Sequence, residues 1–152
     1  MRLGRLIKIL HTLGSLGLMG GVAACLVLRH SAPAYGAEGY QLVREQLNAL
    51  FTVLLVPSVG ITIFSGFASM IVYKPYWNAL WAWAKAGSGV IVLQYTFRMK
   101  WNALELSAPL DPTDPLNVPK ALSNEWSGFW VLLIVSALNV VVGVWRPRFS
   151  VK

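Results

Sequence analysis

Charged residues are scarce in this sequence, and acidic residues are the scarcest. Only 12% of the 152 residues are charged, with 6 acids against 13 lysines and arginines, whereas 56% are hydrophobic. A soluble domain of this length normally carries about twice that share of charge. The composition therefore argues against a soluble protein. The net charge of +7 does not indicate nucleic-acid binding either, because the basic residues gather at the ends of apolar segments and not along one polar face.

Cysteine is almost absent, and so are the familiar catalytic motifs. The single Cys25 lies in an apolar run and supports neither a disulfide framework nor a CxxC metal site. No GxGxxG, P-loop, HExxH or nucleophile motif occurs. Soluble-enzyme chemistry therefore has no support in this sequence.

The sequence does contain four apolar segments, at about residues 7–28, 47–73, 76–97 and 126–145. The first covers about 22 residues, roughly 33 Å as a helix, which is enough to cross a bilayer. A cleaved signal peptide is the alternative, but the run is long for one and Arg29-His30 interrupts the approach to any cleavage site. We therefore predict an all-α fold, a four-helix transmembrane bundle that forms a single domain over residues 1–152.

The connections between these segments differ in length and composition. Residues 38–47 have helical spacing, so the second helix is expected to begin before its apolar part. Lys74-Pro75 joins the second and third segments as a tight hairpin, whereas four prolines predict an extended loop over residues 106–120. Within the second segment, Pro57 is expected to kink the helix and free the carbonyl near Val53.

The distribution of basic residues predicts the topology. The positive-inside rule places both termini in the cytoplasm, because the terminal regions and the short second loop hold most of the lysines and arginines that lie near the ends of apolar segments. The residues concerned are Arg2, Arg5, Lys8, Lys74, Arg146, Arg148 and Lys152.

His11 is an ionisable residue about one turn inside the first apolar segment. Gly14, Gly21 and Cys25 follow it at helical steps on the same face. Small residues let a neighbouring helix, or a flat ligand such as a porphyrin, approach the backbone closely. Two interpretations stay open: a ligand or catalytic histidine, and an interfacial histidine beside a Gly17 and Gly21 packing motif.

Lys85 lies about nine residues past Tyr76, roughly 13 Å into the third segment. A lysine at that depth costs about 2.5 kcal/mol or more unless it is paired or solvated. We therefore expect it to face the bundle interior, where its partner is an anionic ligand, a carbonyl, water or Glu125. A structural ion pair or a snorkelled anchor is the alternative. In the fourth segment, Asn139 is interpreted as an amide that holds helices together.

Five motifs, taken in order and spacing over nearly the whole chain, resemble the HemJ and CopD-like group of small membrane proteins. Each motif alone is weak, and the series is moderately specific. The chain departs from the group at residues 94–97, where members generally carry a second histidine. The motifs are His11 with Gly20-Gly21 after it, Pro57 followed by Gly66, Trp83-Ala-Lys85, Asn124-Glu125, and Val-Trp-Arg146-Pro147.

The resemblance implies a bacterial inner-membrane protein that binds b-type haem and oxidises protoporphyrinogen IX. On this basis His11 would be the haem iron ligand, since neutral imidazole suits iron. Lys85 would be the catalytic lysine, a cation able to hold a porphyrin propionate. The remaining cofactor-binding positions would be Gly14, Gly21, Asn124, Glu125 and Arg146.

Two non-enzymatic interpretations stay open beside this one. The chain could be an accessory subunit of a homo-oligomer or larger membrane complex, or a CopD-like copper-handling protein. Copper(I) favours thioether, thiolate and imidazole ligands. The sequence places only Met19 and Cys25 near the face of His11, with Met70 and Met99 elsewhere. All three interpretations predict contact with the lipid bilayer and no binding of nucleic acid. The haem-linked interpretation also predicts a porphyrin substrate.

Overall fold

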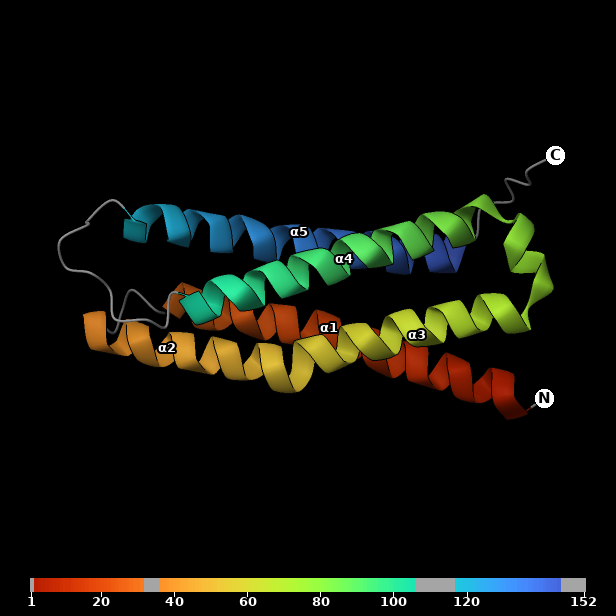
Figure 1. The fold of residues 1–152 in the computed structure, drawn as a ribbon, viewed down its shortest axis with the longest axis horizontal. Helices are drawn as coiled ribbons and strands as arrows, with labels where there is room; N and C mark the ends of the chain where they lie inside the picture. Colours follow the sequence, from red (N-terminus) through yellow and green to blue (C-terminus); the bar gives the residue numbers. More distant parts are fainter. Residues whose placement is uncertain (1, 32–35, 106–116, 146–152) are drawn as a thin grey trace.

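The fold is a bundle of long helices. The computed structural model describes residues 2–31, 36–105 and 117–145. A π-helical turn, η2 (Phe51–Leu55), and a 3₁₀ turn, η3 (Lys74–Asn78), accompany the α-helices (Figure 1). Because α2, η2 and α3 continue into one another, the described chain forms four long helical segments, as predicted. The α-helices are α1 (Arg2–Ser31), α2 (Gly36–Leu50), α3 (Val56–Val72), α4 (Leu80–Glu105) and α5 (Asn117–Trp145).

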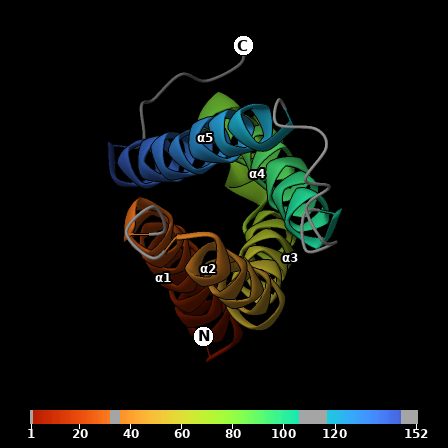
Figure 2. The ribbon, with the colours of Figure 1, turned by 90° about the vertical axis from the view of Figure 1, so that its left-hand side faces the viewer.

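The segments are arranged in a ring. Helix α1 packs against α3 and α5, and α4 packs against the same two helices from the opposite side. Figure 2, viewed along the bundle, shows this order around the centre. Among the described residues, the diagonal pairs α1 with α4 and α3 with α5 are not in close contact. The centre of the ring must therefore be filled by side chains or by a ligand.

The bend between α2 and α3 follows from Pro57. Proline lacks the N–H that would bond the carbonyl four residues earlier, and its ring crowds that carbonyl. The chain widens into the turn η2 directly before Pro57, which lies in the first turn of α3. This confirms the irregularity expected near Val53. Such wide turns are a common way for a helix to absorb a proline.

Glycines set the close approach of α1 to α3. A Cβ on Gly14 would lie 2.9 Å from the Ser58 carbonyl oxygen and 3.0 Å from the Thr62 nitrogen. A Cβ on Gly21 would lie 3.0 Å from a Leu55 methyl carbon. At Gly14 no side chain of α1 separates the helices, so α1 can lie directly against the backbone of α3, whereas Gly21 makes room for the Leu55 side chain of η2. These contacts are those expected if the glycines of α1 serve helix packing.

Replacing Gly14 with alanine is expected to lower the free energy of unfolding by about 1–3 kcal/mol. Its Cβ would meet backbone atoms of α3, which cannot swing aside as a flexible side chain can. Gly20→Ala is the matched control, because no atom lies within 4 Å of its Cβ position. There, alanine should be neutral or stabilising by up to about 1 kcal/mol. Thermal unfolding in detergent measures both, and equal midpoints would contradict the close approach.

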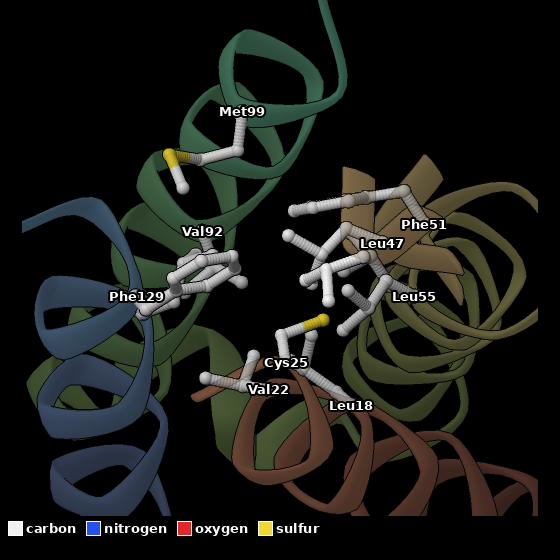
Figure 3. Close-up of a cluster of buried hydrophobic side chains, with 12 residues drawn as sticks. Leu18, Val22, Cys25, Leu47, Phe51, Leu55, Val92, Met99 and Phe129 are labelled. Atoms are coloured by element: carbon white, nitrogen blue, oxygen red, sulfur yellow. The ribbon is translucent and has the colours of Figure 1, made fainter. Parts of the chain in front are cut away.

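The hydrophobic core occupies the half of the bundle farther from the termini. There the rings of Phe51 and Phe129 stack with centroids 6.0 Å apart. Cys25 is fully buried beside Leu47 and Leu55 (Figure 3). The half nearer the termini has no comparable cluster among its described residues, and it is where the candidate site lies.

The outer surface is strongly apolar. Val53, Phe64 and Val144 are each more than 75% exposed, which is expected where lipid replaces water. Three described helical stretches are long and apolar enough to cross a membrane: Leu3–Ser31, Leu42–Val72 and Glu125–Trp145. Helix α4 is not among them, so its crossing stays a prediction. The fold is that of a helical membrane protein.

Several helix boundaries differ from those predicted. The third helix was expected over 76–97, but 74–78 form η3 and α4 runs from Leu80 to Glu105. Residues 117–120, expected in an extended loop, are the first turn of α5, where Pro119 is tolerated because an N–H there needs no helical partner. The apolar segments mark only the part of each helix that faces lipid, and polar turns extend them. The rest of the predicted loop, 106–116, lies outside the described residues.

Candidate functional site

A cavity of about 670 Å³ lies between α1, α3, α4 and α5, in the half of the bundle that holds the termini. Its lining runs along α1 from Lys8 to Met19, which corresponds to a depth of about 16 Å. This volume falls in the usual range for small-molecule and cofactor sites. Most of the lining is apolar, with a few polar groups among it. Both residues singled out for chemistry, His11 and Lys85, line this one cavity.

Helix α3 orients the imidazole of His11. The His11 Nδ1–H donates to the Thr62 carbonyl oxygen at 3.0 Å, and the Ser65 hydroxyl oxygen lies 3.1 Å from the same nitrogen. Because a carbonyl only accepts, Nδ1 carries the proton and the neutral ring keeps its lone pair on Nε2. Gly66 of α3 lies beside the ring, and a Cβ at this position would be 3.6 Å from His11 Cε1. Metal-binding histidines usually donate their other ring N–H to a carbonyl or carboxylate oxygen in this way.

Lys85 reaches the same cavity from α4. Its Nζ lies 2.6 Å from the position that a Cβ on Gly143 would occupy, so the glycine of α5 makes room for the ammonium group. One turn further along α4, the Ser88 hydroxyl donates to Asn139 Oδ1 at 2.7 Å. That bond ties α4 to α5 and fixes the level of Lys85 in the bundle. The interior position expected for Lys85 and the helix-joining role expected for Asn139 are both present.

The mouth of the cavity is aromatic and basic. Tyr73 stacks on Tyr76, whose ring meets the edge of Trp81, and all three line the cavity. Lys8 Nζ lies 5.9 Å from the centre of the Tyr73 ring. Lys8, His11 and Lys85 are in the lining, and none of the lining residues in the described chain is acidic. The electrostatic character of the cavity therefore favours an acidic ligand.

Glu125 does not join this site. It lies near the far end of the bundle, where its carboxylate accepts a hydrogen bond from Arg44 at 3.1 Å and lies 3.6 Å from Arg29 Nε. The suggestion that it pairs with Lys85 is therefore replaced by an ion cluster that joins α1, α2 and α5. Glu125 and Arg44 are almost fully buried, which gives the carboxylate a structural role.

The other predicted cofactor-binding residues are also placed away from the cavity or cannot be placed. Gly14 faces α3, Gly21 faces Leu55 of η2, and neither is in the lining. Asn124 is part of α5, but the structure describes only its backbone, and Arg146 lies outside the described residues. The predicted site therefore reduces, within the described chain, to His11 and Lys85.

The sequence interpretation missed several lining residues. Met70 was placed elsewhere, but it lies on the cavity wall with Met19 and His11. Its signal was available, because Met70 follows Gly66 by one helical turn on the face that meets α1. The aromatic mouth was missed because its residues lie in and around the linker η3, whose fold depends on ring contacts.

Ser136 is a buried lining residue whose hydroxyl has no hydrogen-bond partner among the described residues. Other hydroxyls of the lining bond back to the carbonyl four residues earlier, as Ser15 does to His11 at 2.8 Å and Thr62 to Ser58 at 2.8 Å. A buried hydroxyl without a partner costs about 1–3 kcal/mol. Ser136 is thus a polar group at the inner end of the cavity that a ligand or its water can satisfy.

No protein-family model, curated protein or solved structure matches this chain. The resemblance to the HemJ and CopD-like group therefore stays a prediction. The fold and the cavity carry the functional argument that follows.

Replacing Ser136 with alanine is expected to stabilise the ligand-free protein by about 1 kcal/mol, because it removes an unsatisfied buried hydroxyl. Thr96→Val is the control: Thr96 is also buried, but its hydroxyl donates to the Val92 carbonyl oxygen at 2.8 Å, so loss of the hydroxyl should destabilise the protein or change its stability little. Thermal unfolding of the purified ligand-free protein measures the sign. A lower midpoint for Ser136→Ala would show that the hydroxyl is already satisfied within the protein.

Proposed function

We propose that this chain is a haem- or porphyrin-linked oxidoreductase of the bacterial inner membrane, resembling HemJ-type protoporphyrinogen IX oxidases, with both termini in the cytoplasm. The observation that carries the proposal is that His11 and Lys85, far apart in the sequence, line one cavity of about 670 Å³. The cavity is mostly apolar, and its described lining contains cations but no acid. The lining also contains the imidazole of His11, which the Thr62 carbonyl oxygen orients.

The donor set fits a metal that is already held by a macrocycle. Among the described residues, no group of three or more histidine, cysteine, aspartate or glutamate side chains could hold a bare metal ion. Haem iron needs only an axial protein ligand, and neutral imidazole is the commonest one. His11 would supply that ligand through Nε2, and bound haem would contribute one-electron redox chemistry.

The protein groups around the cavity have separate tasks. Thr62 holds the His11 ring in the tautomer that binds through Nε2. Lys85 would bind an acidic substituent of the porphyrin by a charge-assisted hydrogen bond, and Gly143 leaves room for its ammonium group. The apolar walls from α3 and α4 would exclude water from the macrocycle, which strengthens both interactions.

The visible absorption spectrum tests the proposal. The protein is purified in mild detergent from cells with an adequate haem supply, and spectra are recorded oxidised and dithionite-reduced, beside His11→Ala. His30→Ala is the control, because His30 is exposed in the last turn of α1 and outside the cavity. A b-type haem spectrum that is lost only in His11→Ala supports the proposal and leads to an assay of protoporphyrinogen oxidation. A colourless, well-folded wild type overturns the haem-binding form.

A copper-handling function is the second candidate, favoured by the position of Met70. The structure brings the thioethers of Met19 and Met70 to the cavity that His11 lines, a set of soft ligands that suits copper(I). Cys25 is not part of it, because it is buried in the core. Copper analysis of the purified protein, beside Met70→Leu, distinguishes this function: bound copper that is lost in the variant, without a haem spectrum, would replace the first proposal.

A further inference from the structure

The cavity reaches the outer surface between α1 and α5. Leu16 of α1 and Val140 and Val144 of α5 line the cavity and are also 63%, 44% and 81% exposed. A side chain that contributes to an internal wall and to the exterior lies at an opening. These residues are therefore the two lips of a gap in the ring of helices.

The two helices are joined at the end of the bundle far from the termini. Far from the termini, Arg29 of α1 lies 3.6 Å from Glu125 of α5. Toward the termini the two helices diverge (Figure 1). The glycines of α1 draw this half of the helix onto α3, which increases its separation from α5.

The other three sides of the ring are occupied. Between α1 and α3, the glycine contacts and the bond from His11 to Thr62 close the wall. Between α3 and α4, a side-chain carbon of Ile63 lies 3.7 Å from the Cβ position of Gly89. Between α4 and α5, the bond from Ser88 to Asn139 joins the helices. Phe67 of α3 also lines the cavity and is 44% exposed, but no lining residue of the facing helix α4 is exposed. Between α1 and α5 both helices contribute exposed lining residues, so entry from the side is expected there.

This opening faces the lipid. Leu16 lies near the middle of the membrane-spanning stretch Leu3–Ser31, and Val140 lies within the stretch Glu125–Trp145. The lips are apolar. On the same side, the Thr12 hydroxyl donates a hydrogen bond within its own helix, to the Lys8 carbonyl oxygen at 2.9 Å. A molecule dissolved in the leaflet can reach the cavity here without crossing water.

We infer that the gap between α1 and α5 is a lateral portal that admits an amphiphile with an acidic group directly from the bilayer. Charge complementarity identifies the occupant, because Lys8 lies at the outer end of the cavity, Lys85 inside it, and no acid in the described lining. The Ser136 hydroxyl offers a polar contact at the inner end. The inference builds on the proposed function, in which the amphiphile is a porphyrin with two propionate groups.

Narrowing the portal tests the inference in reconstituted vesicles loaded with protoporphyrin IX. Val140→Trp places a large ring on one lip, and uptake followed by porphyrin fluorescence should be about tenfold slower. Leu138→Trp is the control, because Leu138 is 57% exposed but does not line the cavity. Leu16→Trp, with Leu13→Trp as its control, repeats the test from α1 should Val140→Trp not fold. Unchanged uptake in both lip variants overturns the inference.

A second probe keeps the test independent of porphyrin binding. The vesicles then contain a fatty acid with a photoactivatable group in its chain, and the crosslinked residues are mapped. The portal predicts labelling at Met19 or Ser136, reduced by about fivefold in Val140→Trp but not in Leu138→Trp. Internal labelling without porphyrin uptake would retain the portal and overturn the porphyrin function. Labelling confined to outward residues such as Leu138 would overturn the portal.

Discussion

Replacing Glu125 with alanine is expected to lower the free energy of unfolding by about 3–5 kcal/mol, one of the two largest effects we predict. The carboxylate lies 3.1 Å from Arg44 and 3.6 Å from Arg29, and the three side chains are at most 10% exposed. Its removal would leave two guanidinium groups close together in a buried position. Both the lost attraction and the new repulsion act against folding.

The matched control for this variant is Glu45→Ala. Glu45 follows Arg44 in the sequence but is exposed on α2, so its loss should change stability by less than about 0.5 kcal/mol. A triple variant with Arg29→Met, Arg44→Met and Glu125→Leu should recover most of the loss, because an apolar cluster often replaces a buried ion cluster without cost. Thermal unfolding in detergent measures all three. Similar midpoints for Glu125→Ala and Glu45→Ala would contradict the structural role of the cluster.

The helical bundle could be predicted from the sequence because lipid imposes strong constraints on composition. The apolar segments indicate where the chain crosses hydrocarbon, and the proline at 57 predicts an irregular turn, which the structure has at η2. Helix ends are harder. The helical spacing of residues 38–47 did indicate the early start of α2, but the polar turns at 98–105 leave the apolar pattern while the backbone continues as helix. No hydropathy signal marks the residue at which such a turn ends.

The candidate site was predictable only where a residue carried an energetic cost of its own. A lysine in the third apolar segment, such as Lys85, and a histidine beside glycines, such as His11, are recognisable one at a time. The partner of Glu125 could not be predicted, because the sequence offers Lys85 and several arginines as candidates. Only the positions of the helix ends along the bundle axis bring Arg29 and Arg44 to Glu125. Met70 and the wall from α5 likewise depend on the order of helices around the ring.

The ring order also explains why core and cavity occupy different halves of one bundle. Near Phe51 and Phe129, large side chains meet across the centre and fill it. Nearer the termini, small residues such as Gly89, Gly143 and Ser136 face inward, and the centre is left open. The filled half therefore buries most of the apolar side chains, and the open half provides the volume of the cavity.

Replacing Lys85 with methionine is expected to weaken the binding of protoporphyrin IX by about tenfold to a hundredfold, the range of a charge-assisted hydrogen bond. Methionine keeps the apolar stem, so the wall of the cavity is preserved while the ammonium group is lost. The dimethyl ester of the porphyrin has no acidic group, and its affinity should change by no more than about twofold. Fluorescence titration of the purified protein with both ligands measures the difference.

Two further variants separate the charge of Lys85 from its surroundings. Lys8→Met should weaken acid binding far less, because Lys8 is exposed at the mouth and water screens its charge. Gly143→Ala should reproduce part of the Lys85→Met effect, because the new Cβ would lie 2.6 Å from Lys85 Nζ and would displace the ammonium group. If Lys85→Met weakened acid and ester equally, the lysine would shape the cavity and would not recognise the charge of its ligand.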